Sequence, residues 1–184
     1  MEYLKRNALK LLAFAGSNSS TSINYKLVKY TTTLISEHEV ELLDMTNYSF
    51  PVFSEDLEKQ EGYGPLLVKL KDKIVKSNAL IISVNEHNSN PSAYFKNVLD
   101  WLSRVDRNFL VDKKILLMST SGGRRGAIGS LEVVKSIIPR FGGETVATFS
   151  LPSFKHTFDE QKGITDAEHS EAHKRALESF LSKI

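Results

Sequence analysis

The chain has 184 residues, of which 41% are hydrophobic and 25% are charged, a composition typical of a globular domain that excludes wholesale disorder. Its formal net charge of +2 and the absence of a long Lys/Arg run give no indication of a nucleic-acid partner. Cysteine is absent, which excludes disulfides, thiolate catalysis and Cys-ligated metals.

Five segments of the sequence have the apolar pattern of β-strands: 9–15, 39–43, 79–84, 114–119 and 144–149. Segments with helical periodicity alternate with them: 24–36, 65–77, 93–104, 128–141 and 166–182. Pro139 lies inside the fourth helical segment, so we expect that helix to kink or end early. Residues 45–64 predict a long loop with a helical turn near 56–60. The repeated units predict an α/β fold, a doubly wound five-stranded parallel sheet with helices on both faces.

Three loops that follow predicted strands are unusually polar: residues 16–24, 85–91 and 120–126. If the strand order is 2-1-3-4-5, the loops after the first, third and fourth strands are neighbours. Ligands of such sheets bind outside the carboxyl ends of the strands. The three loops would then form one continuous binding rim.

The first of these loops leads into a predicted helix and is rich in hydroxyl groups. Unpaired backbone N–H groups and the helix dipole attract anions at such a position, and hydroxyls add neutral donors. The loop lacks the lysine of a Walker loop and the glycines of a dinucleotide-binding loop. It therefore predicts a site for one terminal phosphate monoester, such as that of FMN. The alternative is a Ser/Thr-rich turn that only caps the helix.

The rim and the segment beside it carry three motifs. They are Gly-Ser-x-x-x-x-Ser-x-Asn over residues 16–24, Asn-Glu-His-Asn over 85–88 with Pro91 and Lys-Asn-x-x-Asp-Trp over 96–101, and Ser-Gly-Gly over 121–123. With these motifs the chain resembles the NADPH-dependent FMN reductases of the flavodoxin-like superfamily, which include azo-, quinone- and chromate-reducing enzymes. The resemblance covers about the first four-fifths of the chain. It implies one flavodoxin-like FMN-binding domain over residues 1–184, with strand order 2-1-3-4-5.

The resemblance also implies which residues bind the cofactor: Ser17, Ser19, Ser22, Ile23, Asn24, Asn85, Glu86, His87, Asn88, Ser121, Gly122 and Gly123. Ser19 stands where arginine is usual, so one neutral donor replaces a charge-assisted fork and we expect weaker flavin retention. His87 replaces a tyrosine and is a candidate proton donor near the flavin. The alternative for His87 is a loop histidine without a chemical role, and the chemistry centred on the flavin requires no catalytic side chain.

The implied activity is an FMN-dependent NAD(P)H oxidoreductase. Hydride would pass from NADPH or NADH through flavin N5 to a small acceptor, such as a quinone, an azo compound, a flavin or a metal oxyanion. One alternative is a non-enzymatic FMN electron carrier of flavodoxin type, and another is a nucleotide-binding regulatory module. In the family, the helix that would carry Lys96 to Trp101 contributes to a homodimer or homotetramer interface. The competing interpretation places Trp101 in the intramolecular core.

No metal site is predicted, because the histidines are scattered. Only His169 and His173 have a helical i, i+4 spacing, and the residues between them do not form the pattern of a two-histidine zinc site. Residues 1–10 lack an apolar stretch of signal-peptide length, and no window approaches a membrane span. We therefore expect a cytoplasmic protein without a membrane partner.

Overall fold

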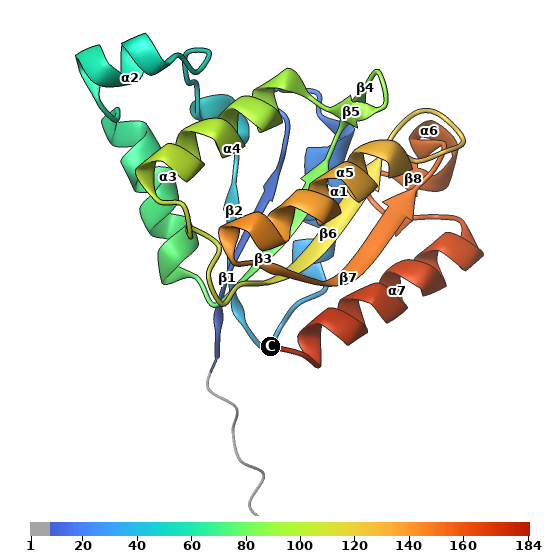
Figure 1. Ribbon diagram of the computed structural model, residues 1–184. Helices are drawn as coiled ribbons and strands as arrows, with labels where there is room; N and C mark the ends of the chain where they lie inside the picture. Colours follow the sequence, from blue (N-terminus) through green and yellow to red (C-terminus); the bar gives the residue numbers. More distant parts are fainter. Residues whose placement is uncertain (1–7) are drawn as a thin grey trace, which may run out of the picture.

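A five-stranded parallel sheet forms the middle layer of the computed structural model, which describes residues 8–184 (Figure 1). The strands are β1 (Lys10–Ala15), β2 (Glu39–Leu43), β3 (Ala79–Val84), β6 (Lys114–Thr120) and β7 (Glu144–Leu151). Their order in the sheet is β2-β1-β3-β6-β7, and every pairing is parallel. The predicted flavodoxin-like order is confirmed. Residues 1–7, part of the predicted domain and of the segment searched for a signal peptide, lie outside the described residues.

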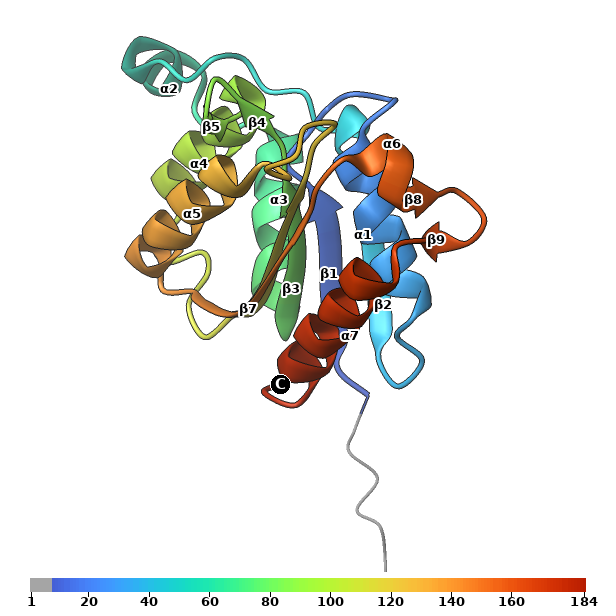
Figure 2. The same ribbon diagram turned by 90° about the vertical axis from the view of Figure 1, so that its right-hand side faces the viewer.

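Helices cover both faces of the sheet (Figure 2). One face carries α1 (Ile23–Thr33) and α7 (Ala167–Leu181), and the other carries α3 (Pro65–Lys76), α4 (Ala93–Val105) and α5 (Ile128–Ile137). Successive strand residues point to opposite faces, so Leu11 packs with the first helix group and Leu12 with the second. Both side chains are 1% exposed. Because both faces are covered, the central strands are continuously apolar, as the sequence pattern predicts.

Most predicted boundaries agree with the structure to within one to three residues. Pro139 ends α5 as expected, because the chain tightens there into the 3₁₀ helix η2 (Ile138–Phe141). The helical turn predicted near 56–60 is confirmed as α2 (Glu55–Glu61), and the loop 45–64 also contains the unpredicted 3₁₀ helix η1 (Met45–Asn47). Residues beyond β7 also contain unpredicted elements: α6 (Phe154–Thr157), β8 (Phe158–Asp159) and β9 (Gly163–Ile164). These elements are too short to produce a hydrophobic period in the sequence.

The segment before α2 is fastened to α4. The side chain of Asn97 donates to Pro51 O at 2.9 Å and accepts from Phe53 N at 2.8 Å. Trp101 Nε1 also donates to Pro51 O, at 2.8 Å, and its ring meets the Phe53 ring edge-on with centroids 5.1 Å apart. Trp101 is therefore only 4% exposed and lies in the intramolecular core, as in the competing interpretation.

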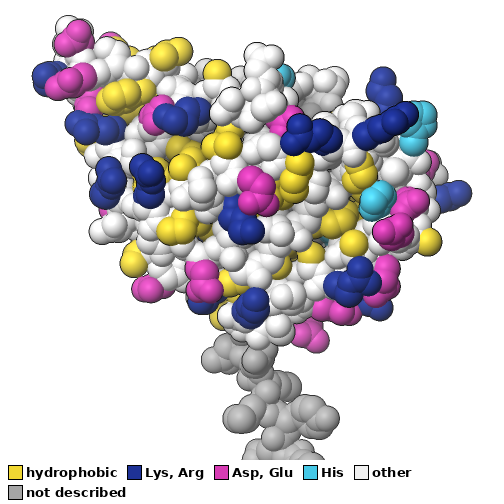
Figure 3. Space-filling view, turned by 45° about the vertical axis from the view of Figure 1, so that its right-hand side comes forward, with side chains coloured by type: hydrophobic (Ala, Val, Ile, Leu, Met, Phe, Trp, Pro, Cys, Tyr) yellow, Lys and Arg dark blue, Asp and Glu magenta, His cyan; other side chains and the backbone are white. Residues whose placement is uncertain are grey.

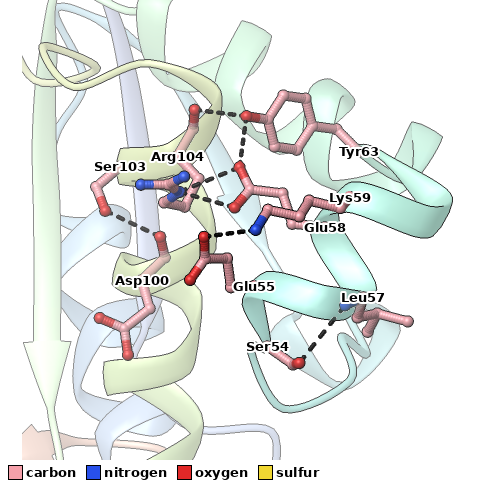
Figure 4. Close-up of polar contacts among 9 residues, drawn as sticks. All are labelled: Ser54, Glu55, Leu57, Glu58, Lys59, Tyr63, Asp100, Ser103 and Arg104. Atoms are coloured by element: carbon pink, nitrogen blue, oxygen red, sulfur yellow. Dashed lines mark hydrogen bonds and ion pairs between the residues drawn. The ribbon is translucent and has the colours of Figure 1, made fainter.

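Helix α2 is held by a second set of contacts, drawn in Figure 4. The Glu58 carboxylate accepts from Arg104 Nε at 3.1 and 2.9 Å and from the Tyr63 hydroxyl at 2.9 Å. Desolvation alone would raise the pKa of Glu58, but the hydrogen bonds from Tyr63 and Arg104 outweigh it, so the pKa is lowered. The contacts keep α2 against α4.

No helix in the described part of the chain combines the length and apolar character needed to cross a membrane.

Candidate functional site

The three polar loops meet at the carboxyl edge of the sheet. Strands β1, β3 and β6 are neighbours, and their register places Ala15 beside Ser83 and Ser83 beside Met118. The start of the first loop is tied to residues on either side of the second: Gly16 N donates to Ser83 O, in β3, at 2.8 Å, and Ser92 Oγ, at the N-cap of α4, donates to Gly16 O at 3.0 Å. The three polar loops thus share one rim, whereas residues 96–101 of the second motif lie along α4.

The hydroxyl oxygens of the first loop accept hydrogen bonds from the loop's own backbone. Ser17 Oγ accepts from Ser19 N at 3.3 Å, and Ser19 Oγ accepts from Thr21 N at 3.3 Å. Ser22 is the N-cap of α1 and accepts from Tyr25 N at 3.1 Å. Ser22 therefore caps α1, as the alternative interpretation of this loop predicts. A hydroxyl that accepts one hydrogen bond can still donate its own hydrogen, so Ser17 and Ser22 can also donate to an anion.

The first turn of α1 adds backbone donors at the same place. The N–H groups of Ile23 and Asn24 have no hydrogen-bond partner among residues 8–184. Their position at a helix N-terminus lies at the positive end of the helix dipole. Loop hydroxyls and helix amides therefore provide donors without a charged side chain.

Asn24 places its side chain in the protein core. It is only 2% exposed, and its amide bonds Ser83 Oγ at 2.7 Å and both main-chain polar groups of Thr120 at 3.1 Å. These bonds join the start of α1 to the ends of β3 and β6. The side chain of Asn24 is thus occupied within the protein, and its backbone N–H, which has no partner among residues 8–184, is the group left to donate to a ligand.

The second loop is a hairpin formed by β4 (Glu86–His87) and β5 (Asn90–Pro91). Its two turn residues, Asn88 and Ser89, have φ of 51° and 61°, the left-handed values of a type I′ turn. The hairpin thus presents His87, which is exposed, beside the rim.

Glu86 serves as a cap for a distant helix. Its carboxylate accepts from Ser130 N, in the first turn of α5, at 2.9 Å, and Ser130 Oγ donates to Asn85 O at 2.9 Å. The local N-cap residue Ala127 is left-handed and supplies no side-chain hydrogen bond. Glu86 therefore fixes the second loop to α5, and a negative charge at a helix N-terminus stabilises this arrangement.

Asn85 carries an unsatisfied acceptor. Its Oδ1 is buried and has no partner among the described residues, and its Nδ2 lies 3.2 Å from His87 Nε2. A buried carbonyl oxygen without a hydrogen bond is costly. A bound molecule with an N–H donor would remove that cost.

The third loop is held from behind by the start of α6. Ser153 N donates to Gly123 O at 2.9 Å, and Phe154 N donates to Ser121 O at 3.0 Å. Gly126 has φ of +57° and leaves no room for a side chain, because an added Cβ would clash with Ser150 Oγ. The backbone conformation and the packing of the loop therefore require glycine at position 126.

Gly122 and Gly123 differ from Gly126 in this respect. An added Cβ at Gly122 would meet nothing within 4 Å, and at Gly123 only Ser121 Oγ at 3.7 Å. Within the described structure, no packing requires the two glycines.

Basic side chains lie close to this loop. Arg124 and Arg125 follow the glycines and are exposed. Lysine, arginine and histidine side chains gather along the upper right edge of the face in Figure 3, on the side of the carboxyl ends of the strands.

Sequence reasoning missed the residues that support the rim. Ser92 and Ser130 bond rim residues from the first turns of α4 and α5, and residues 151–154 bracket the third loop. Ser92 is an N-cap, and a serine before a helical pattern is the signal that identifies it. Nothing in the local sequence pairs Glu86 with Ser130, because that contact depends on the tertiary fold.

Among residues 8–184, no group of three or more His, Asp or Glu side chains is placed to hold a metal ion. His173 lies in the core instead, 2% exposed, with Nε2 2.9 Å from Thr31 Oγ1. Burial lowers the pKa of His173 to about 4, so the ring is neutral at pH 7.

A family model described as NADPH-dependent FMN reductase matches residues 9–156. An NADPH:quinone oxidoreductase from Arabidopsis thaliana is 30% identical over 122 residues, which cover 64% of this chain and 61% of that protein. An NAD(P)H-dependent FMN reductase from Pseudomonas aeruginosa is 27% identical over 119 residues, covering 64% of this chain and 63% of that protein. The matches thus span less than two thirds of these relatives' lengths.

Among solved structures, the flavoenzyme NAD(P)H:(acceptor) oxidoreductase of Paracoccus denitrificans superposes on this chain with a TM-score of 0.77. The two sequences are 22% identical, and the superposition covers 95% of this chain and 96% of the other. At this identity the likeness shows that the fold is shared.

Proposed function

This chain belongs to the NADPH-dependent FMN reductase family, and we propose that it is an FMN-dependent NAD(P)H oxidoreductase acting on a small acceptor. The observation that carries the proposal is the convergence of the three motif-bearing loops on one edge of the sheet. The matches to the relatives named as reductases cover less than two thirds of those proteins, so the activity is inferred from the site together with the family.

The donor set of the first loop suits the phosphate of FMN. Hydroxyls of Ser17 and Ser22 and the backbone N–H groups of Ile23 and Asn24 can all donate to one anion. No lysine or arginine lies within residues 16–24. A site of neutral donors holds a monoester more weakly than one with a guanidinium, and for this reason we expect flavin to exchange with solution.

The remaining loops suit the ring of the flavin. Asn85 Oδ1 offers a buried acceptor for a ring N–H donor, and the open space at Gly122 and Gly123 allows backbone N–H groups to approach the ring closely. Donors at that position would stabilise negative charge on the ring. When bound, FMN supplies hydride acceptance at N5 and electron transfer to a second molecule.

We propose further that the donor and the acceptor use the same open side of the rim in turn, which predicts ping-pong kinetics. Quinones, azo compounds, free flavin and metal oxyanions are the acceptors proposed. A homodimer or homotetramer that uses the α4 surface, and a cytoplasmic location, are part of the same proposal. We also propose His87, which is exposed on the second loop, as the candidate proton donor near the rim.

The test is an FMN titration followed by visible absorbance, with NADPH added without oxygen. Flavin bands that shift on binding and bleach with NADPH, followed by reoxidation with a quinone, are the expected result. Binding without bleaching would favour the electron carrier instead. No binding would overturn the proposal.

A pair of glycine variants tests the site itself. Gly122→Ala and Gly64→Ala each add a Cβ where no atom lies within 4 Å, so neither is expected to perturb the fold. Gly122→Ala should raise the Kd for FMN about tenfold, which corresponds to about 1.4 kcal/mol. Gly64→Ala, at the start of α3, should leave the Kd unchanged. If both variants bind FMN with the same Kd, the third loop does not contribute to the FMN site.

A further inference from the structure

Helix α1 and the hairpin formed by β8 and β9 lie side by side (Figure 2). A hollow of about 360 Å³ is lined by residues of both. Its volume is within the range of about 300–1,000 Å³ that is usual for small-molecule sites. The residues that matter for its chemistry are Ser20, Tyr25, Lys26, Lys29, Tyr30 and Phe158. We call this feature the α1 hollow.

One part of the α1 hollow is aromatic. Tyr30 meets Phe158 edge-on, with ring centroids 5.8 Å apart, and Tyr25 lines the hollow as a half-buried side chain. Gly163 has φ of +77°, and a Cβ added there would clash with the Tyr30 ring. Glycine thus lets the β8–β9 hairpin lie directly against that ring. The hairpin therefore covers the Tyr30 ring, and Tyr25 is the half-buried ring of the hollow that a ligand can contact. Aromatic side chains of this kind stack with nucleobases.

The other part of the α1 hollow is cationic. Lys26 and Lys29 lie on the same side of α1, three residues apart. Lys26 pairs with Glu160 of the hairpin, whereas Lys29 is exposed and forms no ion pair within the described residues. An ammonium group without a partner beside aromatic rings favours a ligand that carries both a ring and a phosphate.

The α1 hollow is continuous with the first loop. Ser20 belongs to the loop and also lines the hollow. Tyr25 lines the hollow, and its backbone N–H donates to Ser22 Oγ, the N-cap hydroxyl of that loop. A molecule whose phosphate rests on the loop could therefore extend from that phosphate directly into the hollow.

We propose that the α1 hollow binds the adenosine phosphate part of a dinucleotide. Both FAD and the hydride donors NADPH and NADH carry this group. The hollow adjoins the loop proposed for the flavin phosphate, and in FAD the adenylate is attached to that same phosphate. FAD is therefore the source that the geometry favours, and FAD should serve this chain beside FMN. The choice of FAD rests on the proposed function, but the binding of an adenosine phosphate does not.

The test begins with 5′-AMP, which requires neither flavin nor turnover. Binding of AMP, FMN and FAD is measured by calorimetry for the parent protein and for Tyr25→Ala, Tyr25→Phe and Lys29→Ala. Lys69→Ala, on the distant helix α3, is the matched control. We expect Tyr25→Ala and Lys29→Ala to weaken AMP and FAD binding about five- to tenfold, each tenfold step being about 1.4 kcal/mol. FMN binding should change less than twofold, and Tyr25→Phe, which keeps the ring, should behave as the parent.

The outcomes separate the two sources and the two proposals. If the variants raise the KM for NADPH and leave FAD binding unchanged, the adenosine phosphate site is supported and NADPH replaces FAD as its source. If AMP does not bind, and neither FAD affinity nor the KM for NADPH responds to any variant, the inference is overturned. If AMP binds but FMN does not, the oxidoreductase proposal fails while the adenosine phosphate site stands.

Discussion

The side chain of Asn24 exchanges two hydrogen bonds with the main chain of Thr120, 96 residues further along the sequence. Asn24 Nδ2 donates to Thr120 O, and Thr120 N donates to Asn24 Oδ1, both at 3.1 Å. The amide thereby imitates one further step of strand pairing at the end of β6. Because Asn24 lies in the first turn of α1 and Thr120 is the first residue of the third loop, this pair sets the first loop against the third.

Replacing Asn24 with alanine should therefore lower the free energy of unfolding by about 2–4 kcal/mol. The substitution leaves the Ser83 hydroxyl and the Thr120 N–H buried without a partner, and unsatisfied buried groups are the costly case. Guanidinium unfolding followed by the fluorescence of Trp101, the only tryptophan, measures the change.

The control for this measurement is Asn18→Ala, an exposed asparagine of the same loop. It should change the free energy of unfolding by less than about 0.5 kcal/mol. An Asn24→Ala protein as stable as this control would show that the three hydrogen bonds contribute nothing to stability.

Glu86 should be needed for the stability of α5 and for the position of the second loop. Glu86→Ala removes the only side-chain cap that the first turn of α5 has among the described residues, and we expect a loss of about 1–2 kcal/mol. Glu86→Gln can still accept from Ser130 N but lacks the charge, so it should lose about half as much. Thermal unfolding of both variants, with exposed Glu132→Ala in the same helix as the control, measures the difference.

The order of effects decides the interpretation of Glu86. If the glutamine variant is as unstable as the alanine variant, the charge at the helix N-terminus provides the stabilisation and the hydrogen bond adds little. If neither variant differs from Glu132→Ala, Glu86 does not cap α5 in solution.

The sequence predicts the layered fold well because the fold depends on repeated local patterns. Continuous apolar strands, alternating helices and Pro139 each leave a signal within a few residues, and the structure agrees with all three. The sequence also predicts which loops form the rim, because the strand order alone brings the carboxyl ends of β1, β3 and β6 together. The roles of Asn24 and Glu86 were not predictable, because their partners lie 96 and 44 residues away. A local pattern cannot distinguish a side chain that binds a ligand from one that binds distant backbone.

Asn97 should hold the segment before α2 in place. Asn97→Ala removes its hydrogen bonds to Pro51 and Phe53, so that segment and α2 should open more often. Lys59, in α2, is the only Lys or Arg between residues 48 and 64, so tryptic cleavage there reports the opening. We expect cleavage at Lys59 to be about five- to tenfold faster, corresponding to about 1–1.4 kcal/mol of local stability.

Asn108→Ala is the matched control, because the Asn108 side chain is exposed and the residue is bonded only through its backbone, to Asp106 and Val111, among the described residues. Its cleavage rate at Lys59 should equal that of the parent. Equal rates for Asn97→Ala and this control would mean that the Glu58–Arg104 contacts alone hold α2.

His173 should make the folded state sensitive to acid. Its folded pKa is about 4, below its ordinary value of 6.5, because burial disfavours the charged ring. Between these values the unfolded chain binds a proton that the folded chain does not. The contribution is therefore fully present above pH 6.5 and is lost as the pH falls toward 4, by about 3 kcal/mol in total.

The measurement is the free energy of unfolding from pH 7.5 to 4.5 for the parent and for His173→Gln, which cannot titrate. We expect the difference between the two curves to shrink steadily below pH 6.5, since the carboxylates are common to both proteins. A constant difference between the parent and His173→Gln across this range would mean that His173 is accessible to protons in the folded state, and hence that the packing of α7 over Thr31 opens readily.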